Sequence, residues 1–234
     1  MTIAEKLQLI AKNVQKNFDA GKKAEYDEFW DNYLQNGKRK NFNCAFAGYG
    51  WNHDNLKQNH AEKLKPTTAY MMFGYADNIT DLSDIHEWVD FSDCTNAQYL
   101  FYNATKLAKV GKLDLRNTTS AGNVFFPCAN LKEVEEIYIT SKTTSGNNFC
   151  SNTSALEKMI FKEGSVINFS GIDLHWAKNL SLESIRSILK ALSSNGNGKS
   201  ITFYTGHQTL IESDAECSAY ASAATSAGWT IAYN

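Results

Sequence analysis

Residues 107–115 read LAKVGKLDL, and residues 131–139 read LKEVEEIYI, which is 24 residues further along the chain. Both stretches order their apolar residues as Leu-x-x-Val-x-x-(Leu/Ile)-x-(Leu/Ile), and each has a phenylalanine six residues before it, Phe101 and Phe125. Recurrence at a fixed period of about 20 to 50 residues is typical of a solenoid, in which each repeat stacks on its neighbours. The sequence therefore predicts an α/β repeat solenoid with short parallel strands. A repeat architecture of this kind favours a role in recognition over a role in catalysis.

Two series of apolar residues recur in step between residues 67 and 180. The aromatic series has spacings of 28, 24 and 24 residues, at Phe73, Phe101, Phe125 and Phe149. The aliphatic series has spacings of 28, 24, 25 and 24, at Ile79, Leu107, Leu131, Leu156 and Leu180. One repeat cannot cover both faces of such side chains, so we expect them to be buried between repeats. Each repeat also predicts a strand with an inward pair: Val89/Phe91, Leu113/Leu115, Ile137/Ile139 and Met159/Phe161.

Side chains that alternate with the inward pairs are expected to face outward. They form the candidate ligand-binding face, which comprises Trp88, Asp90, Lys112, Asp114, Arg116, Glu136, Tyr138 and Lys158. Trp88 and Tyr138 are its expected aromatic anchors. Lys112, Glu136 and Lys158 should form a column of alternating charge on adjacent strands. The alternative is an ordinary solvated sheet, in which each exposed ion pair contributes about 0 to 1 kcal/mol.

Asp90 and Asp114 are the residues on this face that could carry a reaction. Two carboxylates on neighbouring repeats repel each other unless Arg116, Lys112 or a cation lies between them. Glycosidases use carboxylate pairs, so a glycan hydrolase is a remote alternative. The five histidines and five cysteines show no metal-ligand spacing, and no phosphate-binding or nucleophile motif is present. We therefore expect no catalytic residues, no metal and no cofactor.

The chain divides into four predicted parts. Residues 1–36 form an N-terminal helical segment, residues 37–66 an aromatic and glycine-rich N-terminal cap, residues 67–180 the repeats, and residues 181–234 a C-terminal helical repeat or cap that ends in a helix and a strand. The N-terminal helix either lies over the end of the repeats or forms a short self-association seam, which would make the chain a homo-oligomer. The seam would consist of Ile3, Leu7, Ile10 and Val14.

Composition narrows the class of partner. The 234 residues include 23 basic and 25 acidic side chains, so the near balance of charge does not favour a nucleic acid or an anionic membrane surface. Neither a membrane-spanning apolar stretch nor the hydrophobic segment of a signal peptide is recognisable. We therefore expect no membrane insertion.

The repeats at 107–115 and 131–139, their preceding aromatic residues and the segment DFSDCT at 90–95 resemble the BspA-like group of leucine-rich repeats. The segments AGKKAEYDEFW at 20–30, AFAGYGW at 45–51 and SAATSAGWTI at 222–231 are similar to repeat proteins encoded by gut Firmicutes and their phages or prophages. The resemblance covers essentially the whole chain. It implies a leucine-rich-repeat solenoid, no cofactor, and a role in adhesion or tail-tip recognition. Together with the lack of a recognisable signal peptide, it implies a location in a virion or tail particle, or in the bacterial cytoplasm. It supplies no catalytic residues.

Three functions follow from these observations. The leading hypothesis is a non-enzymatic recognition or structural protein of a phage or prophage tail, which binds a protein or a cell-surface glycan and contacts other tail proteins. The alternative is a bacterial surface adhesin or an intracellular scaffold. The glycan hydrolase that uses Asp90 and Asp114 remains the third.

Overall fold

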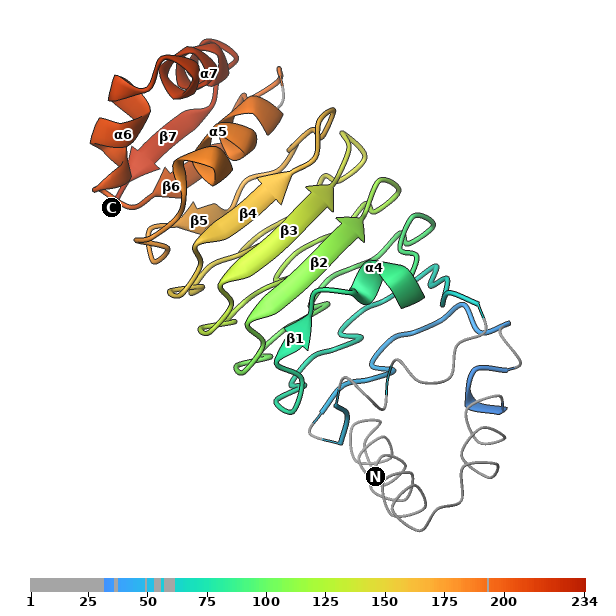
Figure 1. Cartoon of the computed structure of the whole chain (residues 1–234). Coiled ribbons are helices and arrows are strands. Elements are labelled where there is room, and N and C mark those ends of the chain that lie inside the picture. Colours follow the sequence, from blue (N-terminus) through green and yellow to red (C-terminus); the bar gives the residue numbers. More distant parts are fainter. Residues whose placement is uncertain (1–31, 36–37, 49, 53–55, 57–61, 193) are drawn as a thin grey trace.

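The computed structural model describes residues 32–35, 38–48, 50–52, 56, 62–192 and 194–234. The chain is elongated, and its strands lie side by side along the long axis (Figure 1). It is a mixed α/β protein with short parallel strands in two sheets. The N-terminal helical segment and the predicted seam of Ile3, Leu7, Ile10 and Val14 lie outside the described residues, except for residues 32–35.

The first sheet has the strand order β1-β2-β3-β4. Its strands are Asp81–Leu82, Lys109–Asp114, Glu133–Tyr138 and Lys158–Phe161. The register of β2 and β3 follows the period of 24, because Val110 pairs with Val134 and Leu113 pairs with Ile137. The inward pairs predicted for β2, β3 and β4 are all buried. The sequence period of 24 is therefore the register between β2 and β3.

A second ladder of backbone contacts runs along another side of the repeats. Isolated parallel bridges join, in order, Asn41, Thr68, Asn96, Ser120 and Ser145. Residues 41–48 make the same inter-repeat hydrogen bonds as the later repeats, for example from the Phe46 N–H to the Met72 carbonyl (2.8 Å). Part of the predicted N-terminal cap therefore pairs as the repeats do. Phe46 extends the buried aromatic series and lies 5.5 Å from Phe73 between ring centroids.

The aromatic series is buried along its whole length, but its last member is displaced by one position. The Phe73 and Phe101 rings are stacked, with an interplanar angle of 11°. Because Ser120 pairs with Ser145, the residue equivalent to Phe125 is Cys150, and Phe149 takes the position of Val124. Phe125 and Phe149 accordingly meet edge to face at 85°. Phe125 and Phe149 are therefore 24 residues apart in the sequence, as expected, but they do not occupy the same position of the repeat.

The first repeat is longer by four residues, which corresponds to about one helical turn. This turn is helix α4, Ile85–Trp88. It rotates Trp88 into the core, where the side chain is 4% exposed and lies edge to face with Phe73. The expectation that Trp88 faces outward as an aromatic anchor is therefore wrong. Val89 and Phe91 are buried as expected, although Val89 makes only a single bridge with Leu64 instead of forming a strand.

Helix α4 can lie against β2 because residue 111 is a glycine. A Cβ atom at Gly111 would stand 2.0 Å from the Ser83 carbonyl oxygen and 2.9 Å from His86 Nδ1. The next repeat has Glu135 in the same part of its strand and no such helix across it. Gly111 therefore allows the turn to cross the first sheet, where it forms one wall of the groove described below.

The C-terminal part forms the second sheet, with the order β5-β6-β7: Ile172–Leu174, Ser200–Phe203 and Thr230–Tyr233. Residues 181–234, predicted as a helical repeat or cap, begin with α5, Leu182–Ala191, and the Ser181 hydroxyl accepts from the Ser184 N–H as its N-cap. The helix predicted near the end of the chain is α7, Ala215–Ser226. Strand β5 and helix α6, His207–Ser213, were not predicted. Among the described residues no helix is both long and apolar enough to span a membrane.

Candidate functional site

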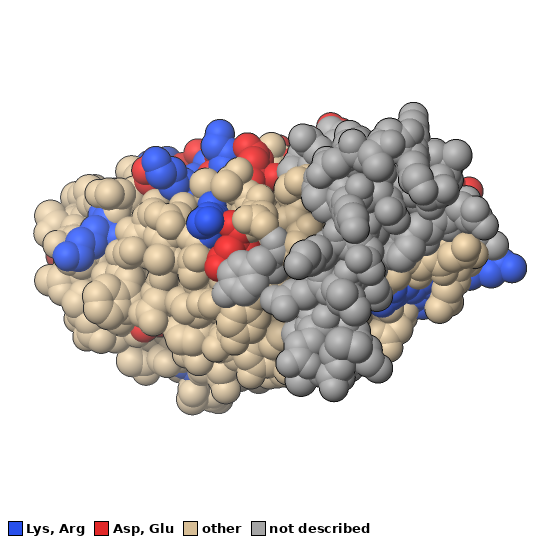
Figure 2. Space-filling model, turned by 90° about the horizontal axis from the view of Figure 1, so that it is seen from below, with Lys and Arg blue, Asp and Glu red and all other residues tan. Residues whose placement is uncertain are grey.

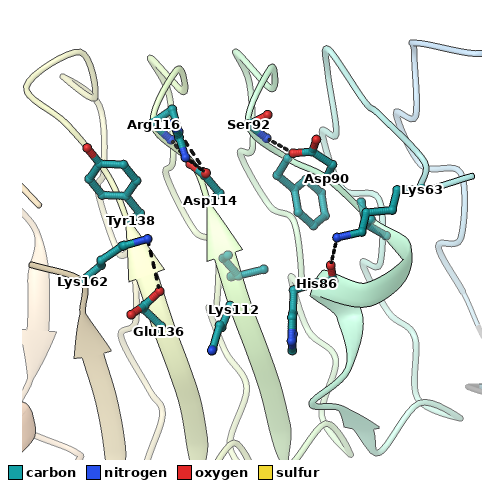
Figure 3. A pocket seen from close by; sticks show the side chains of 13 residues that line it. Lys63, His86, Asp90, Ser92, Lys112, Asp114, Arg116, Glu136, Tyr138 and Lys162 are labelled. Atoms are coloured by element: carbon teal, nitrogen blue, oxygen red, sulfur yellow. Dashed lines mark hydrogen bonds and ion pairs between the residues drawn. The ribbon is translucent and has the colours of Figure 1, made fainter.

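The outer face of β2 and β3 carries a groove that contains most of the predicted ligand-binding residues. Its volume is about 420 Å³, and helix α4 borders it on one side (Figure 3). Asp90, Lys112, Asp114, Arg116, Glu136 and Tyr138 line it together with Lys63, His86, Ser92 and Lys162. The apolar side chains of Val89, Phe91 and Leu113 complete the lining. In the view of Figure 2 the charged side chains gather along the upper edge of the molecule and in a smaller group near the centre, and most other described atoms are uncharged.

Arg116 engages both oxygens of Asp114. Its Nε atom lies 2.8 Å from Oδ1 and 2.9 Å from Oδ2, and its terminal nitrogen also bonds Oδ2. The hydrogen bond and the charge of Asp114 raise the pKa of Arg116 above its usual value. Arg116 therefore provides the positive charge that the sequence required beside the Asp114 carboxylate. Both groups remain accessible, since the side chains are 48% and 30% exposed.

Tyr138 lies between two cations, which places an aromatic ring at the centre of the charged groups. The Arg116 guanidinium carbon is 5.2 Å from the ring centroid, and Lys162 Nζ is 5.5 Å from it. Distances of this size permit cation–π attraction. Lys162 Nζ also lies 3.9 Å from Glu136 Oε1. Tyr138 therefore faces outward and lines the groove, whereas its role as an aromatic anchor stays a prediction.

Asp90 stands at the α4 end of the groove, and its Oδ1 accepts from the Ser92 N–H at 3.0 Å. Partial burial raises the pKa of Asp90, but the hydrogen bonds from Ser92 and the charges of Lys65 and Lys63 outweigh it, so the net pKa lies below the usual value. A glycosidase acid needs a carboxyl whose pKa is raised. The lowered pKa of Asp90 is the opposite of what this acid role requires, and the Asp114 carboxylate is bound by Arg116.

The predicted column of Lys112, Glu136 and Lys158 is wrong in its third member. Lys158 pairs with Glu133, with Nζ 3.0 Å from Oε1, and lies outside the groove. The hydrogen bond to Glu133 raises the pKa of Lys158. The register shifts between Val134 and Ile137, because this stretch of β3 has one residue more than β4. Both Glu135 and Glu136 are thereby partly exposed, and Glu135 lies 3.3 Å from Lys112.

Four further polar residues of the groove were absent from the predicted site, and one of them is Ser92, whose N–H donates to Asp90. Lys63 comes from the segment before the repeats, and its ammonium donates to the His86 carbonyl at 2.8 Å. His86 comes from helix α4, and Lys162 follows β4 directly. Strand alternation would have placed Lys162 on the outer face, because it directly follows the buried Phe161. No sequence signal placed Lys63 or His86 there, because both depend on the extra turn in the first repeat.

The groove presents positive, negative and aromatic groups within one open depression. Such a surface suits a ligand that carries both donors and acceptors, and its charges set orientation more than total affinity. Among the residues that the structure describes, no cluster of three or more histidine, cysteine or acidic side chains is arranged to hold a metal ion. Cys94, Cys128, Cys150 and Cys217 are buried free thiols, and burial raises the pKa of Cys94 to about 11.

Comparison of this chain with protein-family models, with curated proteins and with solved structures finds no match.

Proposed function

We propose that the chain is a non-enzymatic recognition or structural protein that uses a leucine-rich-repeat solenoid as a rigid platform for ligand binding. The observation that carries the proposal is the groove over β2 and β3, where Arg116, Tyr138 and Lys162 lie together on adjoining repeats. The parallel strands beneath it repeat with one register, so its side chains have a fixed spacing. Binding sites on regular elements are more rigid than sites on loops.

The ligand class is a protein or a cell-surface glycan that carries charged groups of both signs. Asp90, Asp114 and Glu136 lie beside Lys63, Lys112, Arg116 and Lys162, so the groove has no single sign of charge. A nucleic-acid surface would instead gather basic groups on one face. The resemblance to BspA-like repeats of phages and prophages supports a place in a tail, and a bacterial adhesin or scaffold is the alternative.

A cell-binding assay with matched lysine variants tests the groove. Lys162→Ala removes a groove lysine whose side chain is 48% exposed and whose partner is Glu136, whereas Lys190→Ala removes an equally exposed lysine paired with Glu163 elsewhere. We expect labelled protein to bind intact cells of the bacterial host, and we expect Arg116→Ala and Lys162→Ala to weaken that binding while Lys190→Ala does not. Equal binding by all three variants would remove the groove from the proposal.

A further inference from the structure

A second exposed aromatic surface lies away from the groove, on the ladder that joins Thr68, Asn96 and Ser120. It consists of Tyr70, Tyr75, Tyr99, Tyr102 and Phe126, and we call it the aromatic ladder. Tyr75 is 38% exposed, and the other four side chains are partly exposed. None of these residues belongs to the groove lining.

The rings of the aromatic ladder contact one another in a continuous series across three repeats. Tyr99 meets Tyr70 at 5.3 Å and Tyr102 at 5.2 Å, both edge to face. Tyr102 in turn meets Tyr75 at 5.4 Å and Phe126 at 6.1 Å. Edge-to-face packing fixes each ring at an angle to the next, so the rings form a stepped surface and do not stack flat.

Two of these tyrosines have an unfavourable backbone conformation. Tyr99 has φ of 60°, and the equivalent residues of the next two repeats, Asn123 and Asn148, have φ of 58° and 55°. Tyr75 has φ of 58° at the position of Asn103, with φ of 54°. Asparagine tolerates the left-handed region, whereas a bulky residue there is an outlier. The left-handed conformation belongs to the repeat itself, because Cys44 and Met71, at the position of Tyr99 in the two preceding units, have φ of 53° and 52°. The tyrosines occupy these positions at a cost in strain that asparagine largely avoids.

The segments that carry this side of the repeats are free of charge. Residues 66–76, 94–105, 117–131 and 143–156 contain no aspartate, glutamate, lysine or arginine. In the following repeats the positions equivalent to Tyr99 carry carboxamides, and Asn148 Nδ2 donates to Asn123 Oδ1 at 3.3 Å. The surface therefore offers aromatic faces, phenol hydroxyls and carboxamides, in contrast to the mixed charges of the groove.

We infer that the aromatic ladder is a binding surface for a neutral glycan. The C–H faces of pyranose rings are apolar and pack on aromatic rings, while their hydroxyl groups exchange hydrogen bonds with phenols and carboxamides. A protein partner generally adds a polar and charged rim, and arginine is enriched at such interfaces. The uncharged segments favour an uncharged ligand. This inference stands apart from the proposed role of the groove.

Native affinity electrophoresis tests the inference with dextran, yeast mannan, galactomannan and hydroxyethylcellulose as neutral probes and polygalacturonate as an acidic probe. We expect at least one neutral polysaccharide to retard the full chain. Tyr99→Asn, which places the residue of the neighbouring repeats at this position, should weaken that binding by on the order of tenfold, equivalent to one lost aromatic contact. Its melting temperature should remain close to that of the wild type.

The groove variants supply the control. Arg116→Ala and Lys162→Ala should bind the neutral polysaccharide as the wild type does, whatever they do to cell binding. Migration unchanged by every neutral probe would overturn the inference, as would retardation by polygalacturonate alone. Equal loss of neutral-glycan binding in Arg116→Ala and Tyr99→Asn would assign the binding to the groove and would also overturn it.

Discussion

Phe101 lies directly against Phe125 of the next repeat, with ring centroids 5.4 Å apart and ring planes inclined by only 5°. Both side chains are fully buried. Each ring is therefore covered by an equivalent ring one repeat further along, and neither repeat could bury its phenylalanine alone. The core is consequently a single column that runs through the repeats, and the groove rests on the sheet beside it.

Removal of one ring from this column should destabilise the whole chain. We expect Phe125→Ala to lower the free energy of unfolding by about 3 to 5 kcal/mol, because it deletes a buried ring and leaves a cavity between Phe101 and Phe149. Phe126→Ala changes a neighbouring ring that is partly exposed, and its cost should be clearly smaller. Urea unfolding followed by circular dichroism measures both. Equal effects at the two positions would show that the column is not the main core.

Gly111 makes a sharper prediction for the wall of the groove. A methyl group there would stand 2.0 Å from the Ser83 carbonyl oxygen, which belongs to backbone and cannot rotate away. We expect Gly111→Ala to cost about 1 to 3 kcal/mol through overpacking. Lys112→Ala, at the exposed position beside it, should change stability by less than about 0.5 kcal/mol. Chemical denaturation compares the two, and a Gly111→Ala protein as stable as the wild type would contradict the close approach of α4.

The part of the fold that depends on periodicity was predictable, whereas the parts that depend on an insertion were not. The spacing of Leu113 and Ile137 predicted the register of β2 and β3 directly. Trp88 failed because four additional residues formed a helical turn and reversed its direction. The prediction for Lys158 was wrong because Met159 pairs with Val134 and not with Ile137, which places Lys158 beside Glu133, three residues before Glu136. Alternation along the sequence predicts which side chains face outward only where the repeat length is constant.

The candidate site was predicted in its centre and missed at its edges. Asp114 and Tyr138 end β2 and β3, and Arg116 lies two residues beyond Asp114, so alternation along the strands placed them correctly on the outer face. Lys63 and His86 reach the groove through tertiary contacts that no local pattern encodes. The aromatic ladder could have been noticed from the charge-free segments, but its left-handed tyrosines become visible only in the structure.

Acid should weaken the contact between α5 and the start of α7. Asp214 accepts from Arg186 Nε at 3.0 Å and from the Cys217 N–H at 2.9 Å, and these bonds hold its pKa well below the usual value. Because the unfolded carboxyl titrates near 3.9, the stabilisation is complete above about pH 4 and is lost as the pH falls toward the lower folded pKa. We expect Asp214→Asn, which retains an N-cap acceptor, to melt below the wild type at pH 7.

The same variant at low pH provides the check. The difference in melting temperature between Asp214→Asn and the wild type should shrink as the pH falls from about 4 toward 2, because the unfolded carboxyl takes up a proton there while the native carboxyl, whose pKa is lowered, is still ionised. Glu163→Gln, at an 84% exposed carboxylate paired with Lys190, should have almost no effect at either pH. If the difference in melting temperature stayed constant with pH, the charge of Asp214 would not be the source of its stabilising effect.

The backbone at Tyr99 yields a prediction about stability that does not depend on any ligand. With φ at 60°, alanine is strained at this position and asparagine is tolerated. We expect Tyr99→Asn to be more stable than Tyr99→Ala by about 1 kcal/mol, although both lose the contacts with Tyr70 and Tyr102. Thermal and urea unfolding of the two variants measure the difference. If alanine proved the more stable replacement, the left-handed conformation at this residue would be wrong.

We propose that the chain belongs to a recognition particle of a phage or prophage tail. Quantitative mass spectrometry of tail particles or virions purified from the source strain after prophage induction tests this proposal most directly. We expect the chain to copurify with tail proteins in a fixed stoichiometric ratio. Its absence from the particles, together with abundance in the remaining cell fractions, would contradict the proposed function.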